Sequence, residues 1–478
     1  EGARSQMFTK APTGLLFPGD PGAPTGSNFA DRNDWAPRFG FAWSPSSKWS
    51  VRGGFGVFFD VLKGEDNLQF NGQIPFFSSA QLAFDPLPAG FAGNSPIMAD
   101  PFRTAGQTNP FPSKPPARDI DFAANGYLPV GGSGVYFVNP HLRTPYVMQY
   151  NLSVQREVAR ATVLEVNFVG SGSRKLTAIM DANPMLPGTN RRKFNTTPGQ
   201  FSFLDSFENA VSANFASLQA GLTKRLTSNK LGSTYYQASY TWGKTIDNAS
   251  GFRETGTRVS AYRPGQFRAV SDFDVTHTFV FSGGWDLPFD KLWNGGPKLL
   301  TRGWSLYPIV TLNTGFPLDV TARLTRNSTR IGPSGAGDPN IVRADLVGTV
   351  VNFDPRNVQT LRGRRGNYWF DPTAFSNARF TTAFDAQVLA NPSLATYGTL
   401  GRNAIRQPGR KNMDFAVAKT MFFLGEGKLR AELRGEAFNL FNNVQWRDIS
   451  NSITAGAFGQ ATQTYDPRIM QVALRLSF

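Results

Sequence analysis

The carboxyl-terminal stretch, Ile469 to Phe478, alternates between apolar and polar side chains, which predicts a β-strand with one apolar and one wet face. The apolar face carries Met470, Val472, Leu474, Leu476 and Phe478. The other carries Gln471, Ala473, Arg475 and Ser477. In a soluble sheet, an edge strand that ends with an aromatic residue on its apolar face would leave an unprotected edge that is prone to aggregation. In a membrane barrel the edge is paired and the apolar face meets lipid.

The same alternation recurs along the chain and predicts about eleven antiparallel strands. The expected strands cover residues 38–44, 48–59, 146–154, 162–168, 216–222, 236–242, 275–285, 304–312, 413–421, 428–437 and 469–478. The connections alternate between short turns and long breaks, the long ones including Leu62 to Leu142, Ser171 to Asn214 and Gly315 to Gly409. Outer-membrane barrels keep short turns on the periplasmic side and long loops outside, whereas soluble sandwiches scatter their loop lengths.

These patterns predict an all-β fold: an antiparallel transmembrane barrel of the outer membrane with long extracellular loops. Bacterial single-chain barrels have even strand numbers. An odd count therefore predicts that the chain supplies the rear part of a larger barrel.

Composition supports strands over helices. The chain has 42 Phe, 48 Gly and 33 Pro, which suits many strands joined by irregular loops. No stretch approaches the length of apolar sequence that a transmembrane helix needs, so a membrane interpretation rests on strands. The sequence has no Cys and only two His, His141 and His277, so neither disulfides nor a His-based metal site is expected.

The formal charge of +15 raises the question of an anionic partner. The charges are spread along the chain, and the densest groups, Arg191 to Lys193 and Leu361 to Gly366, fall in loop sequence. We interpret them first as solvated loop charge and next as contacts to anionic lipid headgroups. Nucleic acid ranks last, and no nucleic-acid partner is expected.

One predicted strand carries a row of charges opposite its apolar face: Arg430, Glu432, Arg434 and Glu436. Such a row must face water or pair with its neighbours. In a barrel it would be an ion-pair ladder facing the lumen; in a soluble protein it would be an exposed sheet face. The alternating signs favour ion pairing over a catalytic pair of carboxylates.

No catalytic constellation or cofactor site stands out, so the chain is not expected to be an enzyme. Gly53 to Gly56 lies within a strand and does not open a helix, as a phosphate-binding loop would. Asp272, Asp274 and His277 could hold a metal, but a polar transition from loop to strand is the commoner explanation. Four aromatic residues near strand ends fit either an interfacial girdle or core packing in a sandwich: Tyr150, Trp242, Trp285 and Trp304.

Ordered motifs along nearly the whole chain resemble the barrel region of TonB-dependent receptors, specifically the Oar-like branch with an amino-terminal carboxypeptidase-regulatory-like domain. The motifs are GLLFPGD (14–20), WAPRFGF (35–41), VRGGFG (51–56), TPYVMQY (144–150), QR (155–156), FVGS (168–171), YTWGKT (240–245), GTLGRN (398–403) and EAFNLFN (436–442). One departure is Gln407, where the family pattern has glycine, which puts the local turn geometry in question.

The resemblance implies a full-length protein with a signal peptide, a small β domain, a plug and a barrel of about 22 strands. Residues 1–478 would be the carboxyl-terminal part of that barrel, without the plug and amino-terminal domains. It further implies that Val472, Leu474, Leu476 and Phe478 form the terminal strand recognised by the barrel assembly machinery.

The expected function is passage of a substrate across the outer membrane of a Gram-negative bacterium. Expected partners are outer-membrane lipid and lipopolysaccharide, an unknown transported substrate and, only through the absent plug, the TonB complex. Selectivity is expected in Leu62 to Leu142 and Gly315 to Gly409, since exposed loops commonly carry recognition. No residue pattern there dictates a siderophore, glycan, peptide or exported protein.

Two alternatives come from other classes. A soluble or surface-attached β-rich protein could bind carbohydrate through aromatic loops, and it would be released from cells without detergent. An extracellular β-sandwich hydrolase would need turnover that depends on Glu432 or Asp274.

Overall fold

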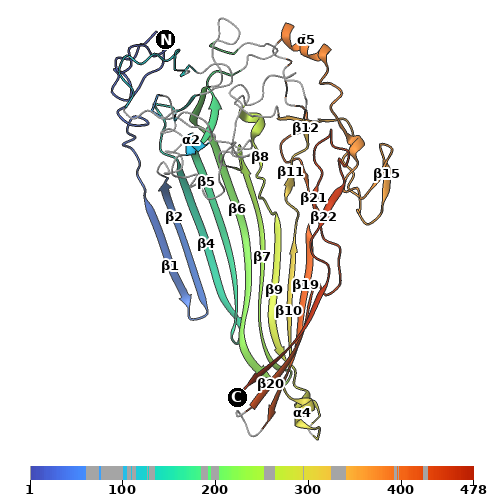
Figure 1. Cartoon of the computed structure of the whole chain (residues 1–478). Helices are drawn as coiled ribbons and strands as arrows, with labels where there is room; N and C mark the ends of the chain where they lie inside the picture. The colour runs from blue at the N-terminus through green and yellow to red at the C-terminus, as the bar shows by residue number, and fades with distance from the viewer. Residues whose placement is uncertain are drawn as a thin grey trace.

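The computed structural model gives the arrangement of most of the chain (Figure 1). The described residues are 2–60, 75–76, 101–104, 109, 115–125, 127–128, 135–184, 192–194, 204–251, 264–293, 295–323, 341–391, 394, 396, 398–423 and 429–478. Most of the expected loop Leu62 to Leu142, as well as Arg191 and Lys428, lies outside these residues.

One large antiparallel sheet forms the body of the described structure. Its main path contains eleven strands, as the sequence predicted. They are β1 (Arg38–Ser46), β2 (Trp49–Phe59), β4 (Tyr146–Ala159), β5 (Thr162–Asp181), β6 (Leu204–Asn229), β7 (Gly232–Asp247), β9 (His277–Asp286), β10 (Trp304–Asn313), β19 (Arg410–Phe423), β20 (Leu429–Phe438) and β23 (Ile469–Ser477). We call these strands the wall.

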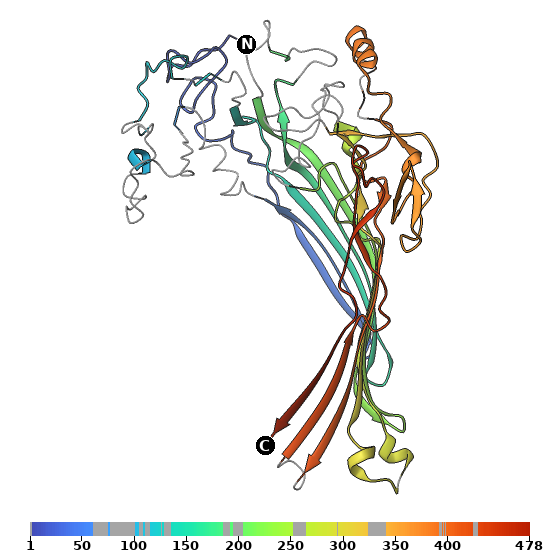
Figure 2. The same ribbon diagram turned by 45° about the vertical axis from the view of Figure 1, so that its right-hand side comes forward.

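The connections separate by length between the two ends of the wall, which confirms the predicted asymmetry. The short turns between β1 and β2, β4 and β5, and β6 and β7 gather at the end near the carboxyl terminus (Figures 1 and 2). The connection between β9 and β10, with α3 (Phe289–Leu292) and α4 (Lys298–Thr301), lies at that end as well. The described parts of the long connections lie at the opposite end, which we call the outer end.

Among the described residues β1 and β23 are the two margins of the sheet, and they do not pair with each other. Every neighbouring pair on the path is antiparallel, so the first and last of eleven strands run in the same direction. Direct closure would join two parallel strands. An all-antiparallel barrel therefore needs an odd number of further strands between β23 and β1.

The predicted break from Ser171 to Asn214 is wrong at both ends, because β5 continues to Asp181 and β6 begins at Leu204. The ladder between them shifts register on both sides of Leu176. Such irregularities interrupt the period-two pattern while the strands stay paired. A short strand, β3 (Val135–Val138), pairs in parallel with β6.

The long connections at the outer end are not structureless. The described parts of 315–409 and residues 445–465 together form what we call the outer-loop unit. Its elements are β11 (Pro317–Leu318), β12 (Thr321–Arg323), β13 (Ile341–Arg343), β14 (Asp345–Leu346), β15 (Gln359–Leu361), β16 (Arg364–Gly366), η4 (Pro372–Ala374), β17 (Phe375–Ser376), α5 (Thr382–Ala390), β18 (Ile405–Arg406), β21 (Trp446–Ile449) and β22 (Ala461–Thr464). Three further short elements lie elsewhere: α2 (Pro101–Thr104), η3 (Pro264–Phe267) and β8 (Ala269–Val270).

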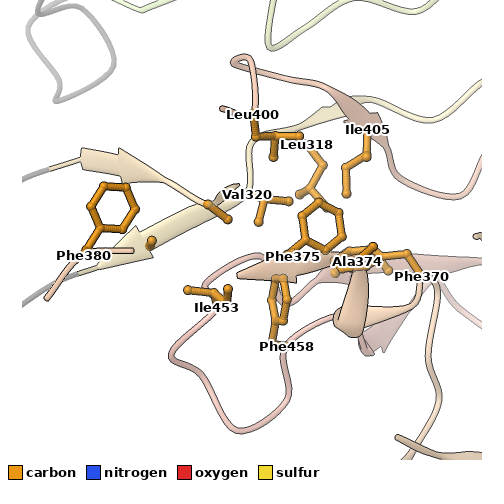
Figure 3. Packing of buried hydrophobic residues seen from close by; sticks show 13 residues of the cluster. Leu318, Val320, Phe370, Ala374, Phe375, Phe380, Leu400, Ile405, Ile453 and Phe458 are labelled. Carbon is orange, nitrogen blue, oxygen red and sulfur yellow. The ribbon is translucent and has the colours of Figure 1, made fainter. Parts of the chain in front are cut away.

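The outer-loop unit has a hydrophobic core of its own (Figure 3). Phe370, Phe375 and Phe458 meet edge to face, with ring centroids 5.2–5.8 Å apart. Val320 and Ala322 beside them are fully buried. Residues from two long connections therefore share one core, which holds those connections together as a folded unit.

The departure at Gln407 is accommodated. Its backbone does not adopt a left-handed conformation, and its N–H donates to the Phe316 carbonyl at 2.8 Å. The position that needs glycine is Gly315, where a Cβ would lie 1.8 Å from the Gln407 carbonyl oxygen. The described part of the chain contains no helix long and apolar enough to cross a membrane.

Candidate functional site: the polar face and its outer loops

The strand register joins side chains of one kind into a continuous polar face across the wall. Asn167 of β5 lies between Ser153 of β4 and Gln219 of β6, and Gln219 pairs in turn with Thr241 of β7. The face continues from Thr241 to Thr278 of β9, which pairs with Asn313 of β10, and Asn313 pairs with Arg410 of β19. The same faces of β19, β20 and β23 carry Asp414, Glu436 and Gln471.

The opposite face of the same strands is apolar. In β5 the neighbours of Asn167 are Val166 and Phe168, which pair with Val154 and Leu152 of β4. Their large side chains point away from the polar face, and many are exposed in the isolated sheet. A one-sided apolar surface of this extent requires a nonaqueous environment, which a bilayer supplies.

The predicted charge row lies on the polar face. Arg430 and Glu432 form an ion pair at 2.8 Å, and Arg434 and Glu436 form another at 2.6 Å. The side-chain amide of Gln471 in β23 also donates to Glu436. These contacts make a ladder of paired charges, while its position in a barrel lumen stays a prediction.

The terminal strand presents its predicted residues on the apolar face. Val472, Leu474 and Leu476 lie in β23 and are 78%, 63% and 58% exposed, and Phe478 follows one residue beyond the strand. Glu432 and Leu433 of β20 pair with Arg475 and Leu474, so the two faces remain in register up to this margin. Recognition of the strand by an assembly machinery stays a prediction.

The four predicted girdle aromatics also belong to the apolar face. Trp285 and Trp304 lie toward the short-turn end, where their indole N–H groups donate to the carbonyls of Leu231 and Leu300, each at 2.8 Å. Tyr150 and Trp242 lie toward the other ends of their strands, away from the short turns at Ala159 and Gly232. An apolar ring combined with a satisfied polar tip suits a membrane interface.

Arg402 connects the outer-loop unit to the wall. Its guanidinium donates to the Phe267 carbonyl at 3.1 Å, to Ser250 at 3.0 Å and to Asp272 at 3.1 Å, and it bonds both the carboxylate and the carbonyl of Asp247. Both Arg402 and Asp247 are buried. All five bonds cross between segments far apart in the sequence, so this residue fixes where the unit sits.

Arg406 forms a second connection from the same unit. Its guanidinium donates to the Asp274 carboxylate at 2.5 Å and to the Gly315 carbonyl at 3.0 Å. Asp274 is itself buried and accepts the Thr245 N–H at 2.6 Å. We call Arg402 and Arg406 with their aspartates the arginine latch. Breaking a buried pair from one side leaves an uncompensated charge, so the latch strongly favours the observed placement.

The possible metal trio is divided among other partners. Asp272 binds Arg402 and Asn403, and Asp274 binds Arg406. His277 lies on the apolar face, where its Nδ1 meets the Tyr240 hydroxyl at 2.8 Å. Within the described residues no group of three His, Asp or Glu side chains is placed to hold a metal.

A second anchored region is the segment before β1. Phe8 and Phe17 pack with Phe122 in a small core. Burial raises the pKa of Asp20 beside this core, but bonds from the Ser5 hydroxyl and from the N–H groups of Phe17, Met7 and Gln6 outweigh it and hold the pKa below its ordinary 3.8. The ionised carboxylate therefore stabilises this segment.

Residues 1–471 match the protein family described as the outer membrane beta barrel domain. The chain belongs to that family. Its place in the outer membrane of a Gram-negative bacterium and its large antiparallel sheet are as predicted, although the described strands do not close a barrel. A comparison with curated proteins found no match.

Solved structures similar to this barrel domain include three outer-membrane proteins. The outer membrane transporter YddB from Escherichia coli is 9% identical, with a TM-score of 0.47, and the match covers 92% of this chain and 40% of that one. The ferripyoverdine receptor of the outer membrane of Pseudomonas aeruginosa is 9% identical, with a TM-score of 0.37, and the match covers 92% of this chain and 32% of that one. The ferric citrate transporter FecA is 9% identical, with a TM-score of 0.37, and the match covers 92% of this chain and 38% of that one. The chain spans less than half the length of each.

The arginine latch was missed from the sequence, although its residues fall in noticed stretches. Arg402 and Asn403 end the motif Gly398 to Asn403. From the sequence, Asp272 and Asp274 are interpreted as a polar transition from loop to strand or as metal ligands, and Asp274 is assigned to the hydrolase alternative as well. The pattern that could have indicated the latch is a polar cluster in each of two long connections, with arginine in one and aspartates in the other. Sequence alone does not show that the two breaks meet.

Proposed function

We propose that this barrel domain forms part of the wall of an Oar-like TonB-dependent receptor and serves passage of a substrate across the outer membrane. The observation that carries the proposal is the continuous polar face, which runs from β4 to β23 along the sheet, opposite an apolar face. A wall built this way separates a hydrated interior from lipid.

Transport explains the arrangement better than catalysis. The acidic residues of the polar face in β20 are paired with arginines, and Asp274 is held by Arg406. Paired carboxylates of this kind lack the free acid or base that hydrolysis requires. Glu432 and Asp274, the residues that the hydrolase alternative needs, are therefore not free acids or bases, and a soluble carbohydrate-binding protein does not account for the apolar face.

We assign the first contact with the substrate to the outer end of the wall. The outer-loop unit has a fixed core and a fixed attachment there, so it can present a defined surface to a substrate arriving from outside. The TonB complex would act through a plug, and the terminal strand would engage the barrel assembly machinery.

The test compares cells with and without the intact gene. Labelled iron chelates, oligosaccharides and peptides are offered with and without an uncoupler of the proton-motive force. We expect one class to be taken up only by cells with the gene, and only while the force is maintained. Equal uptake of every class by both strains, together with unchanged secretion of exported proteins, would contradict the proposal.

A further inference from the structure

A short hairpin on the outer-loop unit presents three arginines in a fixed geometry. Strands β15 and β16 pair from Gln359 with Gly366 to Leu361 with Arg364. The two residues between them, Arg362 and Gly363, both have positive φ, at 51° and 69°. This is the backbone of a tight two-residue hairpin turn, whose twist matches the flanking strands.

The hairpin is braced from beneath by a buried tyrosine. The ring of Tyr368 is 2% exposed, and its hydroxyl lies 3.1 Å from the Leu361 carbonyl and 3.2 Å from the Arg364 carbonyl. On one side, Arg362 donates to the Phe375 carbonyl at 2.7 Å and lies over the Phe458 ring. The hairpin is therefore attached to the core of the unit.

Among the described residues, no carboxylate neutralises the charges of this hairpin. Arg362, Arg364 and Arg365 are exposed, and no carboxylate of the described residues lies within ion-pair distance of them. By contrast, Arg356, which lies close in the sequence, pairs with Asp354 at 2.5 Å. Arg364 and Arg365 are consecutive residues of β16, so their side chains point to opposite faces of the hairpin, and each charge can attract an anion from solution.

The position of the hairpin limits which anion it meets. It stands out at the side of the outer-loop unit in both views, at the level of β21 and β22 beside the outer ends of the wall (Figures 1 and 2). In an outer-membrane protein this is the surface where the phosphate groups of lipopolysaccharide are concentrated. Guanidinium groups suit phosphate because they offer paired donors in a planar fork.

We propose that the β15–β16 hairpin is a docking site for phosphate groups of lipopolysaccharide in the outer leaflet. Arg364 and Arg365 bind the phosphates, while Arg362 and Tyr368 position the hairpin. The contact would tie the outer-loop unit to the membrane surface. It does not depend on the proposed transport function.

The experiment uses the intact protein purified from outer membranes in detergent. Binding is measured by titration with mixed micelles that contain either phosphorylated or enzymatically dephosphorylated lipopolysaccharide. The double variant Arg364→Gln/Arg365→Gln is compared with Arg160→Gln/Lys230→Gln, which removes the same charge from exposed short turns at the other end of the wall. Heat-modifiable gel migration checks that each variant is folded.

At about 1 kcal/mol for each basic residue near an anionic surface, the hairpin variant should bind phosphorylated lipopolysaccharide about 30-fold more weakly. The control variant should bind like the wild type, and dephosphorylation should weaken wild-type binding to a similar degree. Arg364→Lys/Arg365→Lys should recover part of the affinity, since it restores charge without the planar fork.

Equal binding by the hairpin variant and the wild type would overturn the proposal, as would equal losses in both double variants. A third titration uses inorganic phosphate. If phosphate binding is lost in the hairpin variant while lipopolysaccharide binding is unchanged, the hairpin serves a soluble anion and the membrane assignment is wrong.

Discussion

The wall and the outer-loop unit satisfy the same physical requirement in opposite ways. In the outer-loop unit, Val320, Ala322 and Phe370 are buried inside the protein, as in a soluble domain. In the wall, apolar side chains such as Val472 and Trp242 are 78% and 54% exposed on the surface of the sheet. One region makes its own core, whereas the other uses the membrane as its apolar phase.

The ion pairs of the two regions differ in how far apart their partners lie in the sequence and in how deeply they are buried. The charges of β20 pair with residues two positions away on the same strand, at 2.8 Å and 2.6 Å, and remain partly accessible. The arginine latch joins residues more than a hundred positions apart and is largely buried. Local pairs suit a wall that faces water, and long-range pairs suit a unit that must be held in place.

The strongest test of the comparison removes apolar side chains from the wall. Leu476→Ser with Phe478→Ser should leave little protein inserted, since each buried large side chain is worth about 1.5–3 kcal/mol and both lie on the predicted lipid face. The matched control, Arg475→Ser with Ser477→Ala, changes the polar face of the same strand and should insert normally. Outer-membrane yield is measured by heat-modifiable migration after extraction. Normal yield of the first variant would refute the assignment of the faces.

The second test breaks the attachment of the outer-loop unit. Arg402→Ala leaves Asp247 buried without its partner, which should cost about 3–5 kcal/mol in the placement of the unit. Hydrogen exchange should increase in residues 341–409 and stay unchanged in the wall. Arg356→Ala, which removes an exposed paired arginine from the same unit, should have little effect. Unchanged exchange in Arg402→Ala would show that the shared hydrophobic core alone holds the unit.

The difference between the regions also explains what the sequence could predict. Alternation located all eleven wall strands, because a strand between water and lipid must alternate. It failed where β5 passes Ser171 and β6 precedes Asn214, since the polar and small residues there no longer mark two faces. The charge row was placed on one face for the same reason that the strands were found.

The outer-loop unit was predicted only as a long break. Its strands are two to four residues long, too short for a period to emerge. Its core joins Phe370 to Phe458, and its attachment joins Arg402 to Asp247, through contacts between segments that no local pattern connects. Tertiary contacts of this kind override local propensity, so the latch could be found only in the folded chain.

The third and smallest test concerns the segment before β1, where the Asp20 carboxylate joins residues 5–7 to Phe17. Asp20 accepts three N–H groups and the Ser5 hydroxyl, which hold its pKa below 3.8. A lowered pKa means that its stabilisation is complete above the ordinary value and is lost as pH falls through the folded value. Asp20→Asn should remove about 1–3 kcal/mol at neutral pH, because an amide accepts fewer of these bonds.

Cleavage by pepsin between residues 5 and 20 should therefore increase in the wild type as pH falls from about 5 to about 2. In Asp20→Asn it should already be high at the upper end of that range. Asp119→Asn, an exposed carboxylate of the neighbouring segment, should follow the wild type. If all three proteins are cut alike at every pH, the aromatic cluster of Phe8, Phe17 and Phe122 holds the segment without the carboxylate. The segment would then be stabilised by its apolar core without a contribution from Asp20, whereas the outer-loop unit is attached through the buried Arg402–Asp247 pair.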